Sequence, residues 1–184
     1  LSRDTNLRGN VDVSDLLRID DGVHVTTIAD RGPVVRYYAD CQYVNNGTID
    51  GVGRLLIRLY DKDMDINLGD VRCNVEVRLI TGAGTTSSTL TLAEDTVIGG
   101  GLDIISEHST YTATLDTDGH ELHAGSLTIG QGGAVRGGNG TIYTATWTST
   151  VGTWLPEQST VVLADGGTIK LAPGQSFNRL EIAS

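Results

Sequence analysis

Three observations on the sequence predict an all-β fold, a parallel β-solenoid of about eight short coils. Glycine makes up 24 of the 184 residues, whereas proline contributes 3 and phenylalanine 1. Apolar runs are short and are separated by turn pairs such as Asn46-Gly47 and Asp118-Gly119, which tolerate positive φ. No stretch carries a sustained helical periodicity. Short strands, frequent turns and no helix signal are typical of stacked β-coils.

The individual coils are predicted from short strands that recur along the sequence. A small residue leads into two apolar positions spaced by two, as in Gly101-Leu102-Asp103-Ile104, and such units recur at the spacing of one solenoid coil. A coil of about 22 residues gives about eight coils. An antiparallel β-sandwich stays open as the alternative, because Asn-Gly and Asp-Gly pairs also close two-residue hairpins. The alternation predicts that eight apolar side chains are buried: Leu102, Ile104, Leu127, Ile129, Ile142, Ile169, Leu180 and Ile182.

Length and charge bound the organisation and the partners. A chain of this length predicts one domain, residues 1–184, in which the polar segment 1–13 forms an amino-terminal arm. The formal net charge is −10 with only two lysines, so a partner bound through nucleic-acid phosphates is not expected. Residues 1–80 hold 10 basic and 13 acidic side chains, and residues 81–184 hold 3 and 10. The sequence contains no run of 18 apolar residues, so a membrane-spanning helix is not expected.

The carboxyl part, residues 86–184, resembles Gly/Thr-rich repeats of secreted bacterial and archaeal surface proteins. A Trp, a Gly-Thr-aromatic step, a Ser-Thr-Val-x-Leu strand and a Phe-x-x-Leu-x-Ile strand follow one another in those repeats. This resemblance implies a parallel β-solenoid with adhesive or envelope-building roles outside the cell. The matching segments are Gly140 to Tyr143, Trp147, Gly152 to Pro156, Ser159 to Leu163, Gly167 to Ile169 and Phe177 to Ile182.

An acidic segment predicts a calcium site. Asp61, Asp63, Asp65 and Asn67 alternate with other residues and therefore share one face of an extended strand. Hard oxygen ligands at this density suit calcium. The segment does not follow the EF-hand pattern, and a solvated strand face opposite three apolar side chains is the competing interpretation. Calcium is the one cofactor that the sequence suggests.

The chain has two cysteines, Cys41 and Cys73, and their separation in the sequence corresponds to one to two of the predicted coils. In an extracellular protein they are expected to form a disulfide if adjacent coils bring their Cα atoms within about 7 Å. Two free thiols, an intermolecular bond and a ligand role are the alternatives. A disulfide between these cysteines would therefore indicate both an extracellular location and a close approach of their coils.

Two Asn-x-Thr sequences mark candidate glycosylation sites. Asn46 and Asn139 both lie in predicted turns, where an exported protein can carry a glycan. Asn-Gly is also an ordinary turn pair and Thr is abundant in this chain. An unmodified turn is therefore the competing interpretation at both positions.

No arrangement of residues identifies a reaction. A Gly-x-Ser-x-Gly elbow is missing from the sequence, and no Ser, His and Asp follow in a familiar order. His120 and His123 lie near acidic side chains, but they face opposite sides of a strand and cannot chelate one metal without a bend. A polar turn is the simplest interpretation, with metal capture or a glycan-binding rim as the alternatives. We assign no catalytic and no cofactor-binding residue.

These observations favour a non-enzymatic extracellular protein that self-assembles into a surface layer, filament, sheath or adhesin. The apolar pattern of residues 177–182 predicts an uncapped strand edge, which recruits another copy or a flanking domain. Glycans are a further candidate partner. A virion spike or fibre segment is the second hypothesis, and a polysaccharide-active β-helix enzyme is the third.

Overall fold

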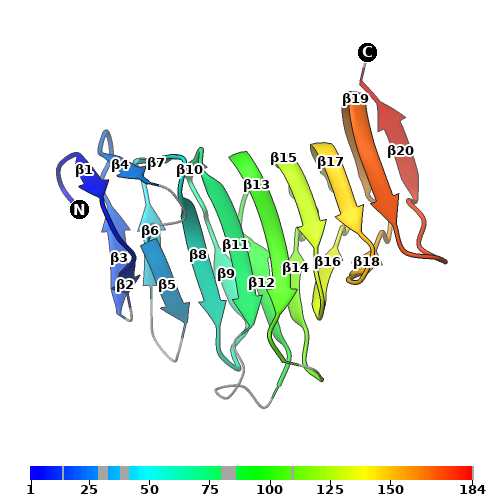
Figure 1. Ribbon diagram of the computed structural model, residues 1–184, viewed down its shortest axis with the longest axis horizontal. Coiled ribbons are helices and arrows are strands. Elements are labelled where there is room, and N and C mark those ends of the chain that lie inside the picture. The colour runs from blue at the N-terminus through cyan, green and yellow to red at the C-terminus, as the bar shows by residue number, and fades with distance from the viewer. Residues whose placement is uncertain (14, 29–32, 38–41, 80–85, 109, 184) are drawn as a thin grey trace.

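The computed structural model describes residues 1–13, 15–28, 33–37, 42–79, 86–108 and 110–183. They form 20 strands and no helix, and the strand pairs between successive coils are parallel. The predicted fold class, a parallel β-solenoid, is therefore confirmed, and the antiparallel sandwich is excluded. The strands follow one another along a rod whose two ends carry the two chain termini (Figure 1).

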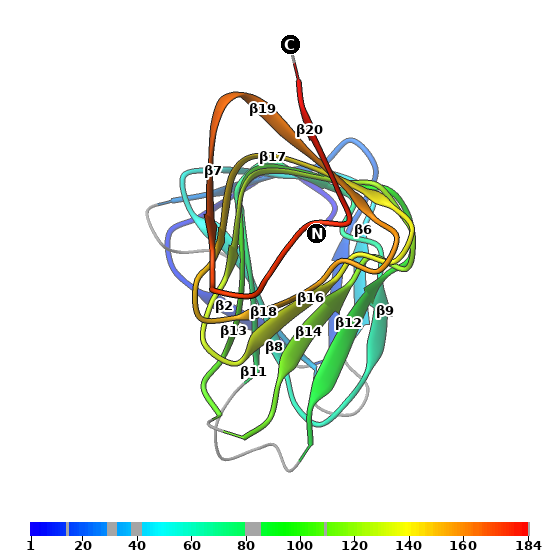
Figure 2. The same ribbon diagram turned by 90° about the vertical axis from the view of Figure 1, so that its right-hand side faces the viewer.

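Each coil has three faces, which superpose along the rod axis (Figure 2). Face 1 consists of β1 (Thr5–Leu7), β4 (His24–Thr27), β7 (Thr48–Gly51), β10 (Asp70–Val71) and β20 (Arg179–Ile182). Face 2 consists of β2 (Val11–Val13), β5 (Pro33–Tyr37), β8 (Arg54–Leu59) and β11 (Asn74–Leu79). Four long strands bend round the corner and serve both faces: β13 (Thr96–Ser106), β15 (Leu122–Ile129), β17 (Thr141–Ser149) and β19 (Thr160–Leu171).

Face 3 is divided into two sheets. One pairs β3 (Leu16–Ile19) with β6 (Gln42–Asn45). The other contains β9 (Met64–Ile66), β12 (Ser88–Leu92), β14 (Ala113–Asp116), β16 (Gly133–Arg136) and β18 (Thr153–Leu155). The described strands complete about seven coils, one fewer than expected, and β19 and β20 follow them.

The coil length varies along the rod, and the number of complete coils is one smaller than expected because residues 172–178, between β19 and β20, form no strand on face 3. On face 1 the interval from Val71 to its partner Ile98 is longer than the interval from Thr5 to its partner Val25. Towards the carboxyl end the repeat shortens again, as the pairing of Ile142 with Val161 shows. Part of this variation lies within the long strands, because the pairing of β13 with β15 shifts its register between Ile98 and Gly101.

Apolar side chains from the three faces meet inside the rod as a single core. Ile49, Ile57 and Leu90, one from each face, have no exposed surface. Near the carboxyl end the core becomes aromatic: Trp147 is completely buried and its ring lies 4.7 Å from that of Trp154 and 5.2 Å from that of Phe177. Edge-to-face contacts of this kind stabilise a core beyond the area they bury.

Five of the eight predicted core residues are buried, namely Leu102, Ile104, Leu127, Ile129 and Ile142. Ile169 is only partly buried. The prediction was wrong for the last two, because Leu180 is 43% exposed and Ile182 is 59% exposed. They pair with Val161 and Leu163 on one side, and no described strand lies on the other side of β20.

Candidate functional site

The predicted calcium ligands lie along the edge where face 3 begins. The Asp61 carboxylate accepts hydrogen bonds from the Thr86 amide at 2.8 Å and its hydroxyl at 3.2 Å. Asp63 accepts the Thr89 amide at 2.7 Å, and Asp65 is exposed on β9. Two of these carboxylates thus join one coil to the next, because both threonines belong to the following coil.

Asn67, the fourth predicted ligand, forms a hydrogen bond with the backbone two residues further along the chain. Its side-chain oxygen accepts the Gly69 amide at 2.8 Å, and Gly69 has φ of +64°. Across the described ranges, no group of three or more His, Cys, Asp or Glu side chains is arranged to hold a metal ion. Calcium binding by Asp61, Asp63, Asp65 and Asn67 stays a prediction.

Cys73 is a buried thiol at the corner between faces 1 and 2. Its Sγ donates to the Asn74 carbonyl at 3.5 Å, and burial raises the pKa of the thiol. Cys41 lies outside the described residues, so the predicted disulfide stays a prediction. A buried thiol with a raised pKa is a poor nucleophile, because the thiolate is the reactive form.

Both predicted glycosylation residues, Asn46 and Asn139, are exposed. Each precedes a glycine that cannot accept a side chain. A Cβ on Gly47 would lie 2.3 Å from the Val23 carbonyl oxygen, and one on Gly140 would lie 2.4 Å from that of His120. The Asn-Gly pairs are therefore required by the close approach of neighbouring coils, whether or not the asparagines carry glycans.

The two histidines do not share a partner. His120 lies 3.4 Å from a carboxylate oxygen of Asp95, and His123 lies 3.5 Å from one of Glu121. The His123 ring stacks on Tyr143 of the next coil with centroids 4.1 Å apart. The two imidazoles thus lie near different acidic groups, and His120 precedes β15 instead of alternating with His123 along one strand.

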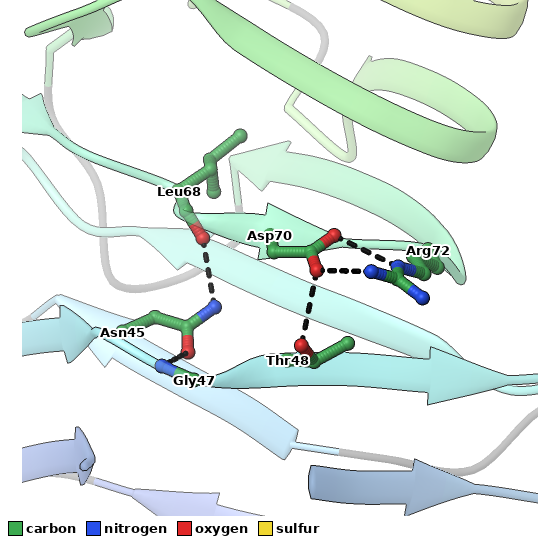
Figure 3. A network of polar contacts seen from close by, with 6 residues as sticks. All are labelled: Asn45, Gly47, Thr48, Leu68, Asp70 and Arg72. Atoms are coloured by element: carbon green, nitrogen blue, oxygen red, sulfur yellow. Dashed lines mark hydrogen bonds and ion pairs between the residues drawn. The ribbon is translucent and has the colours of Figure 1, made fainter. Parts of the chain in front are cut away.

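A polar network replaces the missing sheet pairing on face 3 between β6 and β9 (Figure 3). The Asn45 amide nitrogen and the Tyr43 hydroxyl both donate to the Leu68 carbonyl at 3.0 Å. The Asn45 oxygen in turn accepts the Gly47 amide at 3.2 Å. This network was not predicted from the sequence, although the Asn-x-Gly spacing shared by residues 45–47 and 67–69 signals such turns.

On face 1, beside this network, Asp70 connects two coils. It accepts hydrogen bonds from Arg72 at 2.7 and 3.0 Å and from the Thr48 hydroxyl at 3.0 Å (Figure 3). The Arg72 guanidinium, with help from Thr48, holds the pKa of Asp70 below its ordinary value of 3.8 despite partial desolvation. The same pairing raises the pKa of Arg72. The three side chains thus link two coils, and no cavity opens beside them among the described residues.

No cavity that could enclose a small ligand opens among the residues that the structure describes. The described residues also include no helix of the length and apolarity needed to cross a membrane.

The carboxyl end combines a plug with an open strand. Residues 172–178 cross the end of the last coil (Figure 2). There Gln175 accepts the Ser149 hydroxyl at 2.6 Å and donates to the Gly152 carbonyl at 2.7 Å, while Phe177 packs on the two tryptophans. The chain then continues as β20, where all four residues are exposed. These contacts close the end of the core, whereas β20 has β19 as its one described neighbour on face 1.

The amino end exposes the opposite edges of faces 1 and 2. Residues 1–13, expected to form an arm, contribute β1 and β2 to the first coil. Val11 is 43% exposed and Leu16 is 49% exposed. The β3 edge is partly covered, because the Leu1 carbonyl accepts the Asp20 amide at 3.1 Å.

These features define the chain as a parallel β-solenoid in which β1 and β20 each have one neighbour among the described strands. No protein-family model, curated protein or solved structure matches it.

Proposed function

We propose that the protein is a non-enzymatic structural element of a cell surface that assembles end to end. The observation that carries this proposal is the exposed strand β20. Leu180 and Ile182 occupy the same rows as the buried Val161 and Leu163, yet they have no covering coil among the described residues. An exposed strand with apolar side chains and free backbone groups recruits a further β-strand.

A second copy of the chain is the partner that fits this edge. In a parallel solenoid the last strand of one rod and the first strand of another present complementary hydrogen-bonding edges. Strand β1 at the opposite end of the rod has β4 as its one described neighbour. Joining β20 of one copy to β1 of the next continues face 1 and covers Leu180 and Ile182.

The extracellular location rests on different support. The carboxyl coils resemble repeats of secreted surface proteins, and both Asn-x-Thr sequences expose their asparagine. The abundance of acidic over basic side chains keeps a repeating rod soluble before it assembles. A surface layer, filament, sheath or adhesin is the class of structure that we propose.

The test compares two variants of the intact chain by sedimentation velocity over a concentration series and by negative-stain electron microscopy. Ile182→Lys places a charge on the open edge. Val97→Lys makes a similar change at a side chain that is also 59% exposed, but on β13, which has neighbours on both sides. We expect the wild type and Val97→Lys to form linear oligomers and Ile182→Lys to remain monomeric.

Other outcomes support the competing hypotheses. A closed trimer that persists in Ile182→Lys favours a virion fibre. A wild-type chain that stays monomeric at millimolar concentration contradicts assembly and favours the third hypothesis, a polysaccharide-active enzyme.

A further inference from the structure

A cluster of arginines on face 2 lies far from the ends of the rod. Arg58 of β8 is directly opposite Arg78 of β11, and on its other side it is in register with Arg36 of β5. Parallel strands are about 4.8 Å apart, so three arginine positions follow one another along the rod axis at that spacing. Like charges directly opposite on adjacent strands destabilise a sheet.

Glu76 neutralises part of this cluster. Its side chain is 7% exposed and pairs with Arg54 and Arg78. Arg78 also binds Glu107 at 2.7 Å. Three described guanidinium groups, those of Arg54, Arg58 and Arg78, therefore share two described carboxylates. Among these groups one positive charge remains uncompensated, on a chain whose net charge is −10.

Arg58 carries that uncompensated charge. Its Nε is buried and has no hydrogen-bond partner, and no carboxylate among the described residues pairs with its guanidinium. The Nε of Arg78 is likewise buried without a partner among them. Leaving a charged donor buried and unpaired is costly. Arg58 as a whole is only partly buried, so an oxyanion from solvent can approach its guanidinium and pair with it through two parallel hydrogen bonds.

We propose that Arg58 and Arg78 form an oxyanion site whose ligand is an acidic saccharide carrying carboxylates. The planar guanidinium fork matches a carboxylate, and two arginines that lie one strand spacing apart along the axis suit successive carboxylates of a linear chain. A nucleic acid is disfavoured, because phosphate binding at useful affinity requires many basic contacts and the chain as a whole is acidic. The site does not depend on end-to-end assembly, since it lies in the middle coils.

The experiment titrates the intact chain with linear trigalacturonate by calorimetry at about 20 mM salt, where charge screening is weak. Neutral galactotriose serves as the ligand control. Arg58→Gln removes the unpaired guanidinium. Arg18→Gln is the matched variant, because it removes the same charge from an arginine on face 3 that is 63% exposed and already paired with Asp20.

We expect trigalacturonate to bind the wild type and Arg18→Gln within about twofold of each other, and galactotriose not to bind. Arg58→Gln should weaken binding by about tenfold or more, as expected for a lost charge-assisted pair. Inorganic sulfate should compete with the trimer, because both present oxyanions. If Arg58→Gln does not fold, Arg58→Lys keeps the charge without the fork and should still weaken binding.

Several results overturn the proposal. These are no trimer binding to the wild type, equal losses in Arg58→Gln and Arg18→Gln, no competition by sulfate, or a single-stranded oligonucleotide that binds more tightly than the trimer.

Discussion

The amino-terminal coils, β1 to β12, and the carboxyl-terminal coils, β13 to β20, build the same solenoid in different ways. In the first group faces 1 and 2 are formed by separate strands, and charged side chains tie one coil to the next. In the second group each of four long strands serves both faces, and the core contains packed aromatic rings. A parallel solenoid can therefore be held together either by side-chain pairs between coils or by continuous strands over a large apolar core.

The distribution of charge follows this division. Residues 1–80 hold 10 of the 13 basic side chains, and the ion pairs of Asp70 and Glu76 lie among them. The carboxyl-terminal coils place threonine on the outside of face 2 instead, as in the row Thr146 and Thr168. Substitutions in the core should therefore lower the stability of the carboxyl-terminal coils most. Substitutions of charged surface residues should lower stability more in the amino-terminal coils.

The largest effect is expected for Trp147→Ala. The change removes a completely buried side chain and its contacts with Trp154 and Phe177. Such truncations cost about 3–5 kcal/mol. Urea unfolding should show this loss in the free energy of unfolding, and a loss below about 1 kcal/mol would mean that the aromatic cluster does not organise this end of the core.

Glu76→Gln should be the most damaging change of charge in the amino-terminal coils. It leaves Arg54 and Arg78 without their shared carboxylate and increases the repulsion with Arg58. Loss of one partner from a largely buried pair costs about 1–3 kcal/mol here, since both arginines retain some solvent contact. Thermal unfolding checks this, with Glu121→Gln as a control on an exposed carboxylate.

Gly140→Ala tests the close approach of coils. A Cβ at this position would lie 2.4 Å from the His120 carbonyl oxygen, so the coils must move apart at a cost of about 1–3 kcal/mol. Gly9→Ala is the control, because no atom lies within 4 Å of its Cβ position. Equal melting temperatures for the two variants would contradict the packing described between these coils.

The smallest effect concerns acid stability. The pKa of Asp70 is lowered in the folded chain by Arg72 and Thr48, so its contribution is present above its ordinary pKa of 3.8 and is lost as the pH falls through the lower, folded value. The side chain is 41% exposed, which keeps the contribution small. Melting curves between about pH 6 and pH 2 should therefore fall slightly more steeply for the wild type than for Asp70→Asn.

The sequence predicts the regular part of this fold well. Residues such as Leu127 and Ile129 follow a glycine in an alternating pattern, and alternation on a parallel strand determines which side faces the core. The pattern also places Leu180 and Ile182 on the inward row, but it does not tell whether another coil covers them. Burial at the end of a solenoid depends on whether a further strand packs there.

The candidate sites were harder to predict because they depend on register between coils. Arg58 and Arg78 are separated by a whole coil in the sequence, and only the pairing of β8 with β11 brings them and Glu76 together. The meeting of Trp147 with Trp154 and Phe177 likewise depends on how the coils close. In contrast, a local spacing such as Asn45-x-Gly47 could have been interpreted as a turn from the sequence alone.

Amide hydrogen exchange of residues 179–182 tests the central claim, end-to-end assembly through β20, most directly. The experiment compares a dilute and a concentrated sample of the intact chain, with the exchange of residues 127–129 in β15 as an internal reference. Joining β20 to another copy protects its free amides, so their exchange should slow at high concentration while that of β15 stays unchanged. Equally fast exchange of β20 at both concentrations would contradict assembly through this edge.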